Sequence, residues 1–161
     1  MPRSFVTYLS ENARKDVIGL LNDRLADTVD LTQAVKQAHW NLKGPGFIGV
    51  HELLDQVADH LRDASDLMAE RAVILGGVAQ GTLQQSAANS SLAPYPADII
   101  AIEDHIEALV ERFGDYGAKL RKAIEAAGEA GDEDTADLFT EVSRTADKDA
   151  WFIGSNSPKA A

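Results

Sequence analysis

Four long stretches of the chain repeat apolar residues at helical spacing, and this pattern leaves few folds open. They run from about Glu11 to His39, from about Ile48 to Leu75, from near 96–98 through Ile124, and from 131–134 to about Trp151. No segment competes with them by repeating apolar residues at the two-residue period of a strand. The sequence therefore predicts an all-α protein.

The breaks between these stretches predict how the helices connect. Gly44-Pro45-Gly46 separates the first helix from the second, and Gly76-Gly77 ends the second. A polar connector rich in Ser and Asn then runs from Gly81 to Pro96, with a short helix expected at about Leu83–Ala88. Short loops on both sides of one long crossover are typical of a ferritin-like four-helix bundle.

The length and composition of the chain narrow the possible classes of protein. Its 161 residues fit a single domain spanning 1–161, with short flexible tails at about 1–6 and 155–161. It has no cysteine, so any metal must be held by His and carboxylate ligands. No apolar run approaches the length of a membrane span, and the first residues do not resemble a secretion signal, so we expect a cytoplasmic protein without membrane contact.

A stripe of His and carboxylate side chains follows one face of the second predicted helix. His51, Asp55, Asp66 and Glu70 fall within an arc of about 100°. The opposite arc is apolar and is expected to face the core: Leu53, Leu54, Val57, Leu61, Ala64, Met68 and Ala72. The polar stripe is therefore expected to point away from the core of its own chain.

The spacing within this stripe favours a site shared by two chains. Asp55 and Asp66 are about 16 Å apart along a helix axis, too far for one metal to bridge. In an antiparallel pair of copies, His51 and Asp55 would meet Asp66 and Glu70 of the partner subunit, and symmetry would form the site twice. The alternative for His51 and Asp55 is an ordinary surface pair one turn apart.

A buried metal centre within one bundle is disfavoured. Larger ferritin-like proteins build such a centre from Glu-x-x-His motifs, and none of the four histidines has a Glu three residues before it.

Three segments resemble the signature of the Dps family of mini-ferritins. They are AHWNLKGPGF at 38–47, VHELLD at 50–55 and MAERAVILGG at 68–77. The likeness continues through TADL at 135–138 and DAWFI at 149–153, so it extends over essentially the whole chain. The combination of these segments is far more specific than any single His or carboxylate.

The resemblance implies a hollow shell of twelve copies that oxidises Fe(II) and stores the ferric mineral inside. Such a ferroxidase uses hydrogen peroxide, or dioxygen, as oxidant and protects DNA and the cell from oxidative damage. The matching ligands are His39, His51 and Asp55 from one subunit, with Asp66 and Glu70 from the other. The same ligand types also suit zinc or manganese, which leaves a storage or sensing site open.

The resemblance assigns further roles. Trp40 would lie near the iron and exchange electrons with it, although packing is the commoner use of such a residue. Asp134 and Asp137 would line a pore that admits Fe(II), although acidic residues are also favoured where a helix begins. His60 and His105 match no ligand position and are read as structural or exposed.

The rival interpretation is a nucleoid-associated protein that compacts DNA. Family members that bind DNA often carry basic tails, whereas here the tails offer only Arg3 and Lys159. The formal net charge of −11 per chain would repel phosphate. We therefore expect weak DNA binding or none.

Overall fold

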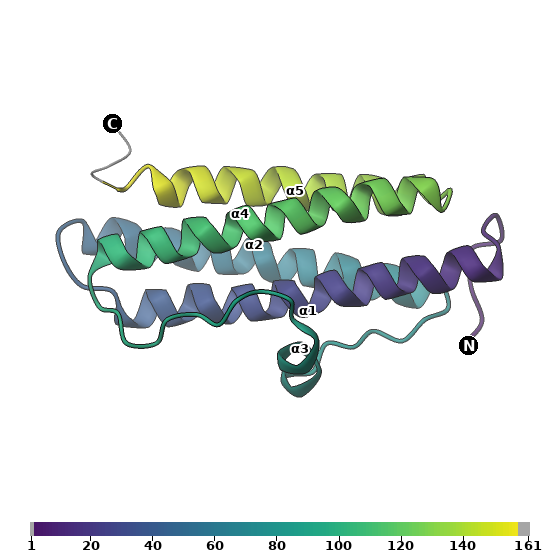
Figure 1. Ribbon diagram of the computed structural model, residues 1–161, viewed down its shortest axis with the longest axis horizontal. Coiled ribbons are helices and arrows are strands. Elements are labelled where there is room, and N and C mark those ends of the chain that lie inside the picture. The colour runs from purple at the N-terminus through teal and green to yellow at the C-terminus, as the bar shows by residue number, and fades with distance from the viewer. Residues whose placement is uncertain (1, 158–161) are drawn as a thin grey trace.

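Four long helices make up the body of the computed structural model, which describes residues 2–157 (Figure 1). The elements are α1 (Glu11–Asn41), α2 (Phe47–Ile74), α3 (Leu83–Asn89), α4 (Ile102–Glu129) and α5 (Glu133–Gly154). The described part contains no strand and no helix long and apolar enough to cross a membrane. The predicted all-α bundle, with a short helix in the long connection, is confirmed.

The bundle is built from two helical hairpins. α1 packs mainly against α2 and α4 mainly against α5, and the short helix α3 lies beside α1 (Figure 1). Side chains cap several helix starts: Ser10 accepts a hydrogen bond from the backbone of Ala13, and Asp132 accepts one from Thr135. These caps satisfy backbone N–H groups that have no partner within their own helix.

The start of α4 corrects the sequence-based expectation. The prediction placed it near 96–98, but the helix begins at Ile102. The N–H of Lys43 donates to the carbonyl oxygen of Ile100 at 2.9 Å, and the N–H of Ile102 donates to that of Lys43 at 3.2 Å. Pairing with the α1–α2 loop therefore keeps 100–101 extended and delays the helix.

The core lies between the two hairpins. The predicted apolar face of α2 is confirmed: Leu53 is half-buried and the other six residues are buried, namely Leu54, Val57, Leu61, Ala64, Met68 and Ala72. Trp151, the last residue of the fourth stretch of apolar residues at helical spacing, has 65% of its surface exposed. It therefore contributes little to the core of a single chain.

The N-terminal segment packs against the end of α2. The N–H of Phe5 donates to the carbonyl oxygen of Ile74 at 3.0 Å. A Cβ at Gly76, whose φ is +85°, would come within 2.8 Å of the backbone oxygen of Pro2, so this close approach requires glycine. Residue 1 of the expected N-terminal tail and residues 158–161 of the expected C-terminal tail lie outside the described part, and the flexibility of both tails stays a prediction.

Candidate metal centre

Two histidines from adjacent helices stack against each other where α1 ends and α2 begins. The ring centroids of His39 and His51 are 3.7 Å apart, and the ring planes differ by 19°. His39 Nδ1 lies 2.8 Å from the carbonyl oxygen of His51, and His51 Nδ1 lies 2.9 Å from that of His39. A carbonyl oxygen only accepts, so both Nδ1 atoms carry hydrogen, and in the neutral form of each ring the lone pair is on Nε2, where a cation can bind.

Asp55 adds a carboxylate beside the histidine pair. Its Oδ1 lies 3.6 Å from His39 Nε2 and 2.5 Å from Lys36 Nζ. The hydrogen bond from Lys36 is the main cause that lowers the pKa of Asp55 below its ordinary value. Asp55 is therefore ionised at neutral pH, as a metal ligand must be.

The rest of the polar stripe lies further along α2. Asp66 and Glu70 are exposed, and neither side chain makes a hydrogen bond or ion pair with another residue in 2–157. Asp66 follows Asp55 by eleven positions, a rise of about 16 Å. Within 2–157 of one chain, no three His, Asp or Glu side chains form a group that could hold a metal ion.

Lys36 is a residue of this site that the sequence reading missed. It precedes His39 by three residues and Trp40 by four, a spacing that places all three on one side of α1. Lys36 Nζ lies 5.6 Å from the centroid of the Trp40 ring, and 64% of the Trp40 surface is exposed. Trp40 therefore does not serve as a packing residue within one chain.

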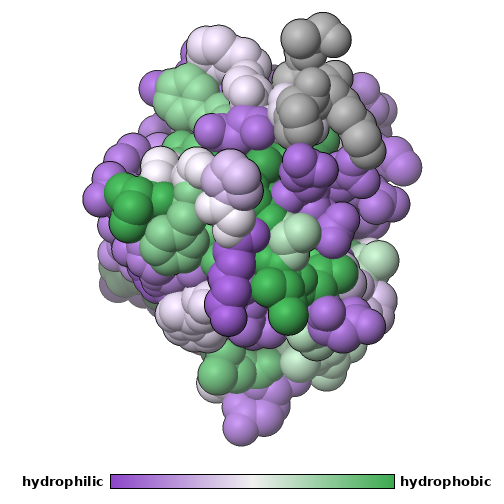
Figure 2. All heavy atoms as spheres, turned by 90° about the vertical axis from the view of Figure 1, so that its left-hand side faces the viewer, coloured by the Kyte–Doolittle hydropathy of each residue, from purple (hydrophilic) through white to green (hydrophobic). Residues whose placement is uncertain are grey.

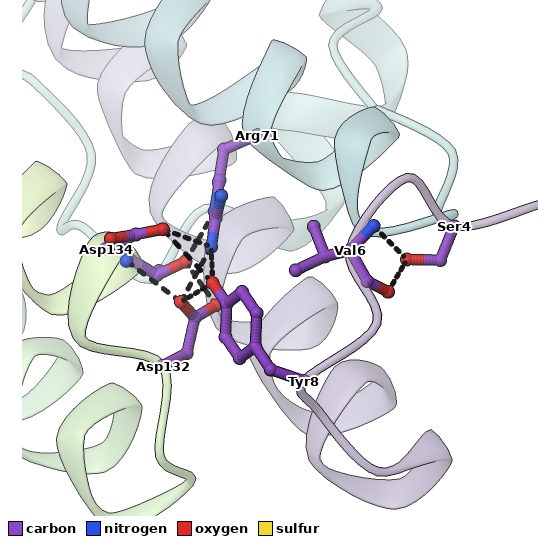
Figure 3. Close-up of polar contacts among 7 residues, drawn as sticks. Ser4, Val6, Tyr8, Arg71, Asp132 and Asp134 are labelled. Atoms are coloured by element: carbon purple, nitrogen blue, oxygen red, sulfur yellow. Dashed lines mark hydrogen bonds and ion pairs between the residues drawn. The ribbon is translucent and has the colours of Figure 1, made fainter.

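The two acidic residues predicted to line a pore occupy different environments. Asp137 is exposed, and its side chain makes no hydrogen bond or ion pair within the described residues. Asp134 accepts a hydrogen bond from the Tyr8 hydroxyl at 3.1 Å and lies 3.8 Å from Arg71 (Figure 3). Arg71 itself is held by the buried Asp132, with Nη2 and Oδ1 2.7 Å apart.

The two histidines read as structural or exposed each have a partner from elsewhere in the chain. His105 is buried, and its Nδ1 lies 2.8 Å from the hydroxyl of Tyr95. Burial lowers the pKa of His105. His60 is exposed on α2, and its Nδ1 lies 3.0 Å from Oδ1 of the buried Asp149 on α5.

The fold defines the class of protein. A family model for the ferritin-like domain matches residues 18–156. Among solved structures, DpsA14 from Streptomyces coelicolor has a TM-score of 0.92 at 34% identity, with 99% of this chain and 96% of that chain covered. Dps from Mycobacterium smegmatis has a TM-score of 0.90 at 30% identity, with 95% and 92% covered.

The curated relatives narrow this class to one family. The DNA protection during starvation protein of Agrobacterium fabrum is 52% identical over 145 residues, which cover 90% of each chain. The chain therefore belongs to the Dps family of mini-ferritins.

Proposed function

We propose that this protein is a ferroxidase and iron store whose sites form between two subunits. His39, His51 and Asp55 of one subunit would bind Fe(II) together with Asp66 and Glu70 of the partner subunit. The stacked histidine pair is the observation that carries this proposal. Both Nε2 atoms are free to bind a cation, beside an ionised carboxylate and on the helix that also presents two unpaired carboxylates.

The surface supports assembly with further copies of the chain. Figure 2 shows apolar side chains among hydrophilic ones at the end of the bundle where α1 ends and α2 begins. Large exposed apolar residues near this end are Trp40, Phe47, Ile48, Ile100, Trp151 and Phe152. Patches of this kind mark contact surfaces. We infer a homo-oligomer of two-fold dimers, twelve copies in all, closed around a cavity.

Each ligand type has a task in the oxidation of Fe(II). The imidazoles and carboxylates hold the ferrous substrate while leaving positions open to an oxidant. Two ferrous ions supply the two electrons that reduce one hydrogen peroxide, with two protons, to two molecules of water. The hard carboxylate oxygens of Asp55, Asp66 and Glu70 favour the ferric product. Dps from Microbacterium arborescens, a structural neighbour described in a high iron form, is consistent with iron as the cargo.

The test is size-exclusion chromatography with iron detection, after Fe(II) and peroxide are added to metal-free protein. We expect ferric iron to elute with a particle of twelve subunits and peroxide to be consumed in proportion. An intact particle that retains no iron and consumes no peroxide would contradict the proposal. In that case tight zinc or manganese binding would point instead to storage or sensing of another metal.

DNA compaction is the second candidate, because the curated relative from Agrobacterium fabrum is named for DNA protection. The charge of −11 and the N-terminal segment packed on α2 both disfavour direct binding. We infer that a cytoplasmic protein of this kind protects DNA by removing Fe(II) and peroxide. A gel shift that persists at physiological salt with clean protein would support nucleoid association instead.

A further inference from the structure

The exposed face of α2 that carries the polar stripe also carries an ion pair and two large apolar residues. With about 100° of rotation per residue, Ile48, Asp59, Arg62 and Val73 fall within the arc that contains the four stripe residues. Ile48 is 61% and Val73 is 49% exposed, and the side chains of Asp59 and Arg62 are both more than half exposed. Within residues 2–157, this face is therefore left uncovered.

These four residues are arranged symmetrically about the middle of the stripe. The proposed metal site pairs position 51 with 70 and position 55 with 66, and both pairs are centred between positions 60 and 61. Asp59 and Arg62 are centred on the same point, and so are Ile48 and Val73. In two antiparallel α2 helices related by a two-fold axis at this point, Asp59 would face Arg62 of the partner subunit. Ile48 would likewise face Val73 of the partner subunit.

The ion pair within one chain leaves capacity for a second ion pair. Arg62 Nη1 lies 2.6 Å from Asp59 Oδ1, and this is the only hydrogen bond or ion pair of either side chain within the described residues. A guanidinium group has five N–H donors, and a carboxylate accepts at both oxygens. Each group can therefore keep the contact within its own chain and also bind the oppositely charged group of a second copy.

We propose that Asp59 and Arg62 of two subunits form reciprocal salt bridges at the two-fold axis of an α2–α2 interface, with Ile48 packed against Val73 of the partner subunit at each end. A second copy of this chain fits the face because the face is complementary to itself. When one copy is reversed on the other, acidic meets basic and apolar meets apolar. The inference rests on the proposed shared site, which supplies the antiparallel arrangement.

This pairing gives the interface an attraction that does not depend on metal. In the same arrangement Asp55 faces Asp66 of the partner subunit, and two carboxylates repel each other when no cation lies between them. The four charges at the axis attract one another and lie between the two copies of the metal site. They therefore set the register of the two helices before Fe(II) binds.

The first test measures this register by cross-linking metal-free protein. The chain has no cysteine, so Ile48→Cys/Val73→Cys introduces the only two thiols. They are about 38 Å apart along one helix, so a disulfide between them must join two chains. We expect mild oxidation to give a covalent dimer. Ile48→Cys/Asp63→Cys places the second thiol at another exposed position, ten residues or about 15 Å out of register, and should not cross-link.

The second test separates pairing between chains from pairing within one chain. Asp59→Arg gives a chain with two basic residues at the axis, and Arg62→Asp gives a chain with two acidic ones, so neither keeps the intrachain ion pair. The two chains are co-expressed in equal amounts, both with the Ile48/Val73 cysteine pair and one with a tag, and the oxidised dimers are separated on a denaturing gel. We expect mixed dimers to exceed homodimers by about tenfold, because like charges meet in each homodimer. The preference should fall towards one in 1 M NaCl.

The control is the same tagged and untagged pair with Asp59 and Arg62 unchanged, which should give equal amounts of mixed dimers and homodimers. A ratio near one for the charge variants, or equal cross-linking of the out-of-register cysteines, would overturn the proposal. Neither test uses metal, so failure of the ferroxidase is distinguishable from failure of this interface. A register-specific cross-link in protein that retains no iron would support the interface and count against the proposed function alone.

Discussion

Arg71 near the end of α2 donates to the fully buried carboxylate of Asp132, which caps α5, with Nη2 and Oδ1 2.7 Å apart. Figure 3 shows that Tyr8 and Asp134 meet the same guanidinium group. One ion pair thus ties together the N-terminal segment, α2 and the start of α5. Removing the arginine would leave a buried charge without its counter-ion.

The first prediction follows from this burial. Arg71→Met should lower the free energy of unfolding by about 3–5 kcal/mol, the usual cost of an uncompensated buried charge. The matched control is Arg121→Met. Arg121 Nη2 lies the same 2.7 Å from an oxygen of Asp147, but both side chains are 55% exposed. This substitution should therefore lower the free energy of unfolding by only about 0–1 kcal/mol. Thermal and denaturant unfolding measure the free energy of unfolding of both variants. Equal losses of stability would contradict a stabilising role for the buried ion pair of Arg71 with Asp132.

The second prediction concerns the shared site. Asp55→Ala and Glu70→Ala should each inactivate every site of a homo-oligomer. In a mixed dimer, one site carries both defects and the other keeps both residues. With random pairing, about a quarter of all sites should regain iron oxidation. Stopped-flow oxidation of Fe(II) by co-expressed, doubly tagged particles measures the recovery; no recovery in verified mixed dimers would refute the shared site.

The third prediction concerns Lys36, whose ammonium group donates a hydrogen bond to Oδ1 of Asp55. At pH 7 Asp55 is ionised with or without this lysine, because its ordinary pKa is 3.8. Lys36→Gln therefore removes only a competing cation, and Zn²⁺ should bind up to about tenfold more tightly. Lys43→Gln changes the charge equally on the exposed α1–α2 loop and serves as the control in the same calorimetric titration. Unchanged or weaker binding in the Lys36 variant would count against competition.

The fourth prediction concerns pH. Burial lowers the pKa of His105 below its ordinary value of 6.5, so the unfolded chain binds this proton more readily than the folded one. The stability from the neutral ring is present above pH 6.5 and declines as the pH falls from there through the lower folded-state pKa. His105→Gln should flatten this part of the curve of unfolding free energy against pH. Parallel curves for the two proteins would show that another group is responsible.

Local sequence patterns were sufficient to predict the four long helices and the polar stripe on α2. Helical periodicity determines which side of α2 is apolar, so burial of Leu54 and Met68 and exposure of Asp55 and Asp66 followed from spacing alone. The Gly-Pro-Gly break and the polar connector likewise predicted the hairpin and the long crossover. Each of these features depends on residues within a few turns of one another.

Tertiary structure decided what depends on residues far apart in the chain. Tyr8 and Asp132 are 124 positions apart, and no local pattern indicates that they meet. The start of α4 depends on hydrogen bonds with Lys43 in the α1–α2 loop. The stacking of His39 on His51 depends on how α1 and α2 pack together. The orientation of His60 depends on a contact with Asp149 on α5. Periodicity reports the faces of one helix, whereas hydrogen bonds between helices require the packed bundle.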